Sequence, residues 1–289
     1  MRTAWPYGSL AVLACAALGA CAGPVELRQQ VMAIDASWRI SKMEGEDFER
    51  MREALVALGA QSPDDPNRIA GLPDVLRIAL NNPSAFVRAE ALRTSWKLGS
   101  DLPRPAWRED ALDREAFNQK TSRLEELVAS PEPPTDETLE LARWLAQYRV
   151  PAKDLEHARL AVSIAEVVLS QGLWRQDALG TAFRDGLQGS AAHALDLVTL
   201  EASRDPYSVV REEALAHVEL LPPELALRLL AELLGRETDS AVVLAALDGI
   251  GRLVGGIEPQ TLRDLLAPLA ASTDVAVRRR VQGLIERLP

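Results

Sequence analysis

The sequence is poor in the side chains that build disulfide frameworks and metal sites. Its 289 residues include 2 cysteines and 3 histidines. Cys15 lies in an apolar amino-terminal run, so Cys21 alone stands outside that run and no disulfide framework is expected. His157, His193 and His217 lie in helical stretches without metal-ligand spacing, and the chain has no HExxH motif. We therefore expect no metal site and a core that depends on packing.

Motifs of the common enzyme classes are also missing. Neither a GxSxG nor a P-loop occurs. The run Gly249-Ile250-Gly251 resembles part of a dinucleotide-binding loop, but that loop joins a strand to a helix, whereas the residues before Gly249 have a helical pattern. His193 and Asp196 are one helical turn apart, which suits either an acid–base pair or, with no further assumption, a hydrogen bond on a helix surface. We interpret the histidines as surface or partly buried residues and the acid pairs as solvated charge.

The amino-terminal apolar run is too short for a permanent membrane span. Leu10–Ala20 is 11 residues long, whereas a membrane-spanning helix needs about 20. Behind the single early charge of Arg2, this run predicts an export signal in residues 1–20. An ordinary signal peptide that ends near a cysteine has the same general form.

The end of this run resembles the lipobox of bacterial lipoproteins. Its residues are Leu18, Gly19, Ala20 and Cys21, with leucine three positions before the cysteine and small residues between them. The resemblance implies cleavage ahead of Cys21 and covalent lipid on its sulfur and new amino terminus. Two or more acyl chains anchor a protein stably. Ala22, in place of the aspartate linked to inner-membrane retention, favours the outer membrane of a two-membrane bacterium.

The charge balance is acidic. There are 32 Lys and Arg against 42 Asp and Glu, a net charge of −10, and loss of residues 1–20 would remove Arg2 alone. An acidic surface repels phosphate backbones and anionic headgroups, so we expect no nucleic-acid partner and no electrostatic adhesion of the folded part to a membrane. Cationic proteins, peptides or divalent ions are the more natural partners.

Beyond the signal, the pattern is helical and contains no convincing alternating strand. Phe48, Met51, Leu55 and Leu58 lie on one helix face that Gly59 ends. The polar stretch 61–67 predicts a hinge. We divide the chain into a tether with amino-terminal helices (21–66), a first hairpin (67–100), an irregular insertion with one helix (101–134) and a helical array (135–289).

Four segments of the chain align as repeats. They begin at Asn81, Arg204, Arg236 and Ala271. Their aligned columns are nearly all apolar: Val87, Val210, Val242 and Val277; Ala91, Ala214, Ala246 and Val281; Ser95, Val218, Ile250 and Ile285; and Leu98, Leu221, Leu253 and Leu288. Steps of four, four and three keep one helix face turned inward. Apolar helices predicted at 222–234 and 258–270 separate the last three copies, so each unit is a hairpin that needs neighbours to bury its face.

These columns resemble the HEAT family, including the HEAT-like repeats of phycobilisome lyase relatives. In that pattern Asp opens the second helix, Val-Arg follows five and six residues later, and a small residue and Leu come next. The second copy matches throughout, with Asp205, Val210, Arg211, Ala214 and Leu215. The other copies match in part: Val87 and Arg88 with Asn82 in the acid position, Val277 and Arg278 with Ser272, and Val242 with Glu237 but with Val243 in place of arginine.

The resemblance implies an all-α fold, an α-solenoid of antiparallel helix hairpins. It also implies a ladder of hydrogen bonds between the Asp and Arg of adjacent repeats, interrupted at Val243. Asp205 and Pro206 suit the cap and first position of a helix. The stretch between the first two copies has room for about three more units. A tetratricopeptide-like arrangement from Trp144 onward has the right scale but lacks that family's Leu-Gly and Tyr positions.

From these features we predict an exported, membrane-anchored, non-catalytic module that binds or scaffolds proteins in the bacterial envelope. Its partner would be a protein or peptide, and its only cofactor-like group the lipid on Cys21. Two alternatives stay open: a bilin lyase-like enzyme, which the family resemblance implies, and a structural assembly factor of the envelope. Candidate partner contacts are the exposed residues among Glu212, Glu213, Arg279 and Arg280, although solubility charges have the same pattern.

Overall fold

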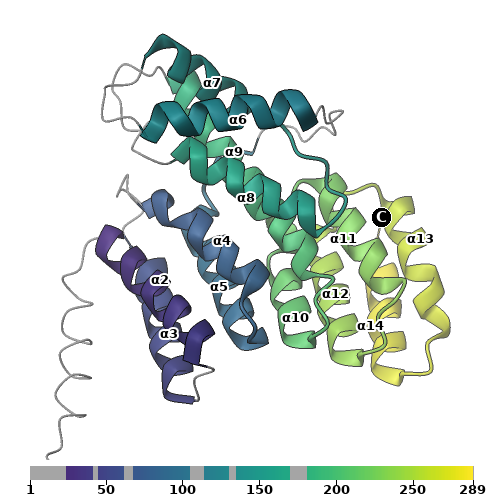
Figure 1. Cartoon of the computed structure of the whole chain (residues 1–289). Coiled ribbons are helices and arrows are strands. Elements are labelled where there is room, and N and C mark those ends of the chain that lie inside the picture. Colours follow the sequence, from purple (N-terminus) through teal and green to yellow (C-terminus); the bar gives the residue numbers. More distant parts are fainter. Residues whose placement is uncertain are drawn as a thin grey trace, which may run out of the picture.

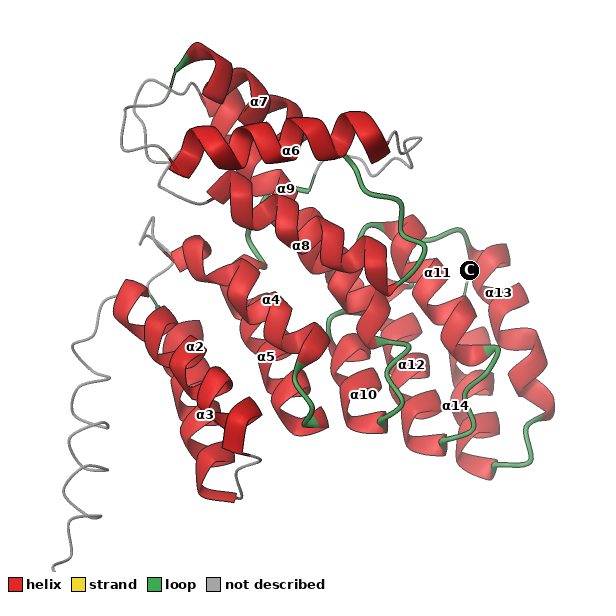
Figure 2. Ribbon diagram, viewed as in Figure 1, coloured by secondary structure: helices red, strands yellow, loops and turns green. Residues whose placement is uncertain are grey.

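The computed structural model describes residues 24–41, 45–61, 68–104, 114–129, 135–169 and 181–288. Within these ranges the regular structure is helical (Figure 2), with thirteen α-helices, short 3₁₀ turns and one isolated bridge between Val254 and Ile257. The all-α prediction is confirmed. None of the described helices is both long and apolar enough to cross a bilayer.

Three successive stretches of the chain, called groups below, carry the helices (Figure 1). The first group is α2 (Pro24–Ser41), α3 (Gly45–Gly59), α4 (Leu72–Asn81) and α5 (Ala85–Gly99). The second is α6 (Arg114–Ala129), α7 (Asp136–Gln147) and α8 (Leu155–Leu169). The third is α9 (Thr181–Ala202), α10 (Ser208–Ala216), α11 (Pro223–Leu234), α12 (Ser240–Leu253), α13 (Pro259–Leu266) and α14 (Val275–Ile285).

The second helices of successive hairpins form a row. Helix α3 packs against α5, α5 against α10, α10 against α12, and α12 against α14 (Figure 1). The first helices make a second layer, in which α4 contacts both α2 and α9, and α9 contacts α11. Each hairpin therefore covers the apolar face of its neighbour, as a hairpin with one apolar face requires.

The first repeat lies directly beside the second, because α5 packs against α10. The expectation of about three further units between them is therefore wrong. The intervening helices instead form a group in which α8 packs on α9 and α4, and α7 packs on α9. Helix α9 contacts both this group and α5, and it has 22 residues against 9 in α10. Gly186 of α9 faces Ala146 of α7, whereas Thr199 farther along α9 bonds Trp96 of α5.

Local signals explain most of the helix ends. Ser84 caps α5, Thr135 and Thr138 form a capping box on α7, and Asp239 and Asp274 cap α12 and α14. The expected helix at 258–270 is shorter, because α13 ends at Leu266 and a 3₁₀ turn follows. Pro268 lacks the N–H that another α-helical turn would need.

The start of α10 differs from the expected one. The helix begins at Ser208, and Tyr207 holds the cap position without a side-chain bond. Asp205 accepts a hydrogen bond from the backbone N–H of Tyr207 at 2.9 Å, which forms a turn ahead of the helix. The prediction of Asp205 and Pro206 as cap and first residue was wrong, since the Asp205 carboxylate also binds an arginine of α5.

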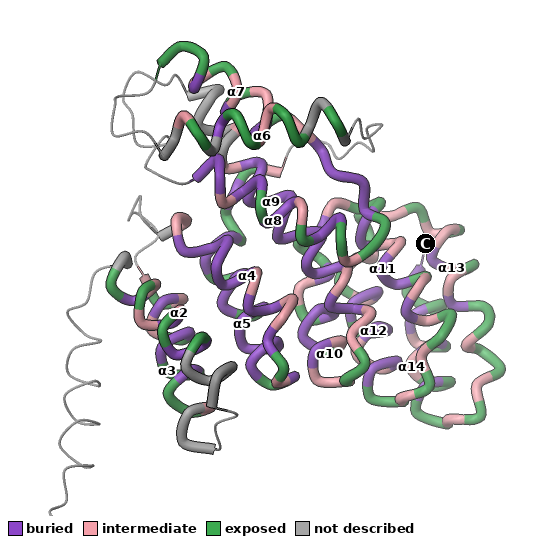
Figure 3. Tube along the Cα trace, viewed as in Figure 1, coloured by how far each residue is buried: buried purple, intermediate pink, exposed green. Residues whose placement is uncertain are grey.

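Buried positions recur along α5, α10, α12 and α14 (Figure 3), and most residues of the aligned columns are among them. Val87, Val210, Val242 and Val277 are all at most 2% exposed. The last unit departs from the pattern, because Ile285 is 38% exposed while its neighbour Leu284 is fully buried. The helical period therefore predicted the inward face well but misplaced it by one residue at the end of α14.

Candidate functional site

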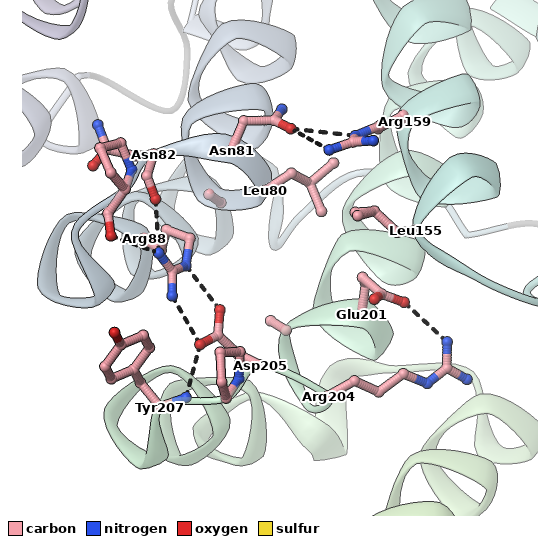
Figure 4. Close-up of a pocket in the computed structure, with 14 residues that line it drawn as sticks. Leu80, Asn81, Asn82, Arg88, Leu155, Arg159, Glu201, Arg204, Asp205 and Tyr207 are labelled. Atoms are coloured by element: carbon pink, nitrogen blue, oxygen red, sulfur yellow. Dashed lines mark hydrogen bonds and ion pairs between the residues drawn. The ribbon is translucent and has the colours of Figure 1, made fainter. Parts of the chain in front are cut away.

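A pocket lies where three segments that are distant in the sequence meet (Figure 4). Its walls come from the segment between the end of α4 and Arg88 of α5, from the start of α8, and from the end of α9 with the loop to α10. Its volume is about 450 Å³. Its lining residues include three arginines, two carboxylates and two leucines. They are Arg88, Arg159 and Arg204; Glu201 and Asp205; and Leu80 and Leu155.

Arg88 and Asp205 form an ion pair in the wall of this pocket. The Nε and Nη2 atoms of Arg88 each donate to a separate Asp205 oxygen at 2.8 Å, and both side chains are about nine-tenths buried. The Nη1 atom donates to the carbonyl oxygens of Asn82 at 2.7 Å and Pro83 at 3.2 Å. A two-bond arginine–carboxylate pair fixes both planes. The bond therefore sets the register of α5 against the next hairpin, and the Arg88 guanidinium also lies 5.6 Å from the centre of the Tyr207 ring.

The same arrangement recurs one unit later. Arg211 donates from Nε and Nη2 to the two oxygens of Glu237 at 2.6 and 3.0 Å, and from Nη1 to the carbonyl of Asp205 at 2.9 Å. Arg278 repeats only the backbone part, with Nη1 donating to the carbonyl of Ser272 at 2.5 Å. At the position between them, Val243 is buried and carries no charge.

The environment of Glu237 favours its ionised form. Burial of this carboxyl acts to raise its pKa, but hydrogen bonds from Arg211 and from the backbone N–H groups of Asp239 and Thr238 lower the pKa below the ordinary glutamate value. The bond between Arg211 and Glu237 is therefore a charged pair at neutral pH.

The other two pocket arginines belong to separate networks. Arg204 binds Glu232 and Glu201 and donates to the backbone oxygen of Lys153 in the loop before α8. Arg159, on α8, reaches across the pocket to Asn81 at the end of α4. The two residues tie the second group of helices to the rest of the molecule.

The four predicted partner contacts do not lie together. Glu212 and Arg279 are exposed, whereas Glu213 is 7% exposed. Glu213 accepts hydrogen bonds from His217 and Arg93, so its assignment to a solvated face was wrong. Burial acts to raise the pKa of Glu213, but these two bonds lower it overall. Arg280 is half-buried and pairs with Asp248 at 2.6 Å.

The three histidines have structural partners. His157 bonds Asp154 at 2.7 Å, and His217 stacks on Trp96 with ring centres 5.3 Å apart. His193 is buried, and its Nε2 lies 3.0 Å from both the amide nitrogen and the carbonyl oxygen of Val150. Burial, and then the charge of Arg149, lower the pKa of His193 to about 4.

His193 and Asp196 do not form the expected surface pair. Asp196 accepts a hydrogen bond from Arg104 at 3.0 Å, and it is as deeply buried as His193. Burial raises the pKa of Asp196 to about 7, against the opposing effect of Arg104. The Arg104 guanidinium also lies 4.9 Å from the centre of the Trp96 ring. No signal in the sequence indicated this cluster, since Arg104 and Asp196 are 92 residues apart.

The lipobox residues Leu18, Gly19, Ala20 and Cys21 lie outside the described residues, as does most of the predicted hinge. Among the side chains that the structure describes, no group of His, Cys, Asp and Glu is placed to hold a metal ion. No family model matches the sequence, and neither a curated protein nor a solved structure matches it.

Proposed function

We propose that this chain is a membrane-anchored, non-catalytic protein-binding or scaffolding module of a bacterial envelope, built as a HEAT-like solenoid. The observation that carries the proposal is the repeated two-bond contact between neighbouring hairpins, Arg88 with Asp205 and Arg211 with Glu237. The same bond at the same place in successive units supports a regular stack. A stack of hairpins offers an extended surface, which suits protein binding.

Exposed apolar side chains mark one edge of the row. Phe86, Tyr207 and Val275 stand at the starts of α5, α10 and α14 and are 63%, 56% and 49% exposed. Phe86 also meets Phe48 edge to face, with ring centres 6.2 Å apart. Aromatic residues of this kind often supply the anchoring contacts of protein interfaces. We assign this set of Phe86, Tyr207 and Val275, named the loop edge, as the partner surface.

The lipid on Cys21 would hold this surface near a membrane. Only two residues separate Cys21 from Pro24, the first residue of α2. The helical part would then begin at the lipid headgroups, and its acidic charge would keep it from lying flat on them.

Affinity capture from detergent-solubilised membranes tests the partner surface. The wild-type chain is expected to recover a protein that a Phe86→Ser/Tyr207→Ser variant does not, because the two aromatic anchors are removed. Leu220→Ser is the matched control, since Leu220 is 40% exposed but outside the loop edge. Equal recovery by wild type and the double variant, or no recovered protein, would contradict the proposal. Robust transfer of a bilin by the purified protein would contradict its non-catalytic part.

Cys21→Ala tests the anchor. In a bacterial host the variant is expected to leave the membrane fraction for the soluble fraction, and to lose labelling by an alkyne-bearing fatty acid, because the thiol is the site of lipid attachment. A variant that stays in the membrane and keeps the label would show that the lipobox interpretation is wrong.

A further inference from the structure

Arg159 differs from the other two arginines of the pocket in its partner. Arg88 and Arg204 direct their Nε and Nη2 atoms at carboxylates. Arg159 directs the same two atoms at a single oxygen, Oδ1 of Asn81, at 3.2 and 3.0 Å (Figure 4). Asn81 is neutral, so the paired donors of Arg159 have an uncharged partner.

A neutral oxygen is a weak partner for this group. The planar guanidinium presents two parallel N–H groups that match the two oxygens of a carboxylate, and a charge-assisted hydrogen bond is about twice as strong as a neutral one. The remaining nitrogen, Nη1, pairs with Glu156 on the same helix at 2.5 Å. Because the side chain of Arg159 is 43% exposed, an incoming carboxylate can reach it and displace Asn81.

The rest of the pocket limits the charge and shape of such a ligand. Glu201 and Asp205 also line it, so a singly charged carboxylate suits the pocket better than a doubly charged phosphate. Leu80 and Leu155 form apolar wall near Arg159 (Figure 4). The pocket can therefore bind one anionic group at Arg159 and an apolar group beside it at Leu80 and Leu155.

We propose that this pocket binds a carboxylate next to an apolar group on a partner peptide, with Arg159 as the anion contact. The identity of the ligand as part of a protein rests on the proposed function, whereas the carboxylate site does not. Binding exchanges the Asn81 oxygen for the two carboxylate oxygens, and the apolar group covers Leu80 and Leu155.

Two small probes test the site on the purified full-length chain. N-acetyl-leucine has a carboxylate and an apolar side chain, and N-acetyl-leucinamide is the same molecule without the charge. Calorimetry or NMR titration is expected to show at least about tenfold tighter binding of the acid, because only the acid forms the charge-assisted pair. Equal affinities, or no binding of either probe, would overturn the proposal.

Two substitutions of Asn81 should differ in their effect on the affinity for the acid probe. Asn81→Asp supplies an internal carboxylate that occupies Arg159, so it should weaken binding of the acid probe at least about tenfold. Asn81→Ala frees Arg159 and should keep or tighten binding. Arg159→Gln should abolish the preference for the acid, and Arg52→Ala, in an exposed ion pair on α3, is the control. Circular dichroism confirms that each variant is folded.

The outcomes separate this site from the protein-binding function. Unchanged affinity in Asn81→Asp would overturn the carboxylate site, whatever the capture experiment finds. Probe binding that follows the expected order, with no protein recovered from membranes, would retain the site and contradict the protein-binding function.

Discussion

Arg211 shows how one side chain can set the contact between two hairpins. It bonds the carboxylate of Glu237 in the next unit and a backbone oxygen ahead of its own helix. The Glu237 side chain is 5% exposed, so loss of the arginine would leave a carboxylate with little access to water. The energetic effect of a substitution here therefore depends more on the Glu237 carboxylate left without its cation than on the lost hydrogen bonds.

We expect Arg211→Ala to lower the free energy of unfolding by about 1–3 kcal/mol, because the Glu237 carboxylate loses its cation and keeps only the backbone N–H donors of Thr238 and Asp239. Thermal and urea denaturation measure the change. Arg279→Ala, at an exposed position of α14, is the matched control and should change stability little. Equal melting temperatures for wild type and Arg211→Ala would show that the pair does not stabilise the stack.

We expect His193 to make the stability of the fold sensitive to acid. Its pKa is about 4 in the folded chain against an ordinary 6.5, so the unfolded chain binds the proton more readily. The stability contributed by neutral His193 is present above about pH 6.5 and is lost as the pH falls towards 4, by up to about 3 kcal/mol. His193→Gln should flatten this part of the stability curve, as urea denaturation between pH 7 and 4.5 would show. An unchanged slope would contradict the assignment.

We expect Asp196 to have the opposite effect on how stability depends on pH. Its pKa is raised from 3.8 to about 7, so its contribution to stability is present below pH 3.8 and is lost as the pH rises through 7. The stability of Asp196→Asn relative to wild type should therefore rise between pH 5 and pH 8. A constant difference over this range would mean that Arg104 keeps Asp196 ionised throughout.

At the scale of helices, two glycines of the array have different reasons to be there. A Cβ on Gly249 of α12 would lie 2.7 Å from Cγ1 of Val218, so this glycine allows close approach of the preceding unit. A Cβ on Gly283 of α14 would meet nothing within 4 Å. The Gly249-Ile250-Gly251 run is thus part of a packed helix, as the sequence context indicated.

Alanine at these two positions should have effects of opposite sign. Gly249→Ala is expected to destabilise the chain by about 1–3 kcal/mol, because the Val218 side chain must move. Gly283→Ala should stabilise it by about 0.5–1 kcal/mol, because alanine has the higher helix propensity and finds open space. Paired urea denaturation curves measure both. Equal effects would show that helix propensity, rather than close packing, decides at Gly249.

Helix ends agreed with the sequence prediction where the backbone preference of a single residue, such as glycine, sets the end. Gly59 ends α3, as the sequence predicted. The start of α10 did not follow its signal, because Asp205 is engaged by an arginine from another hairpin. A long-range charge pair therefore displaced a local cap by two residues.

At the scale of the whole molecule, α9 joins the three groups of helices. It contacts α7 and α8 of the second group, α4 and α5 of the first, and α10 and α11 of the third. The Arg88–Asp205 bond adds a direct tie between α5 and the loop before α10. In the stack of hairpins that we propose, stability is close to a sum of unit and neighbour terms, so weakening one junction can uncouple the parts on either side of it.

Arg88→Ala should loosen the junction between α5 and α10 more than the junctions beyond it. Hydrogen exchange is expected to speed up in α5 and at the start of α10, while α12 and α14 exchange as in wild type, because only the nearest interface loses its bond. Arg278→Ala is the control, since Arg278 donates only to backbone oxygens of its own loop. Uniformly faster exchange along the chain would contradict this local effect.

Local patterns in the sequence were enough to predict the helical class, some helix limits and the inward face of most of the aligned copies, because helical period, proline and glycine act over a few residues. It also identified Arg88 and Arg211 as residues of the unit boundaries. Three features became known from the tertiary contacts alone: α5 lies against α10, Glu213, His193 and Asp196 are buried, and Arg159 bonds Asn81, which is 78 residues away in the sequence. These contacts depend on which apolar faces cover one another, and the local pattern is the same whichever hairpin becomes the neighbour.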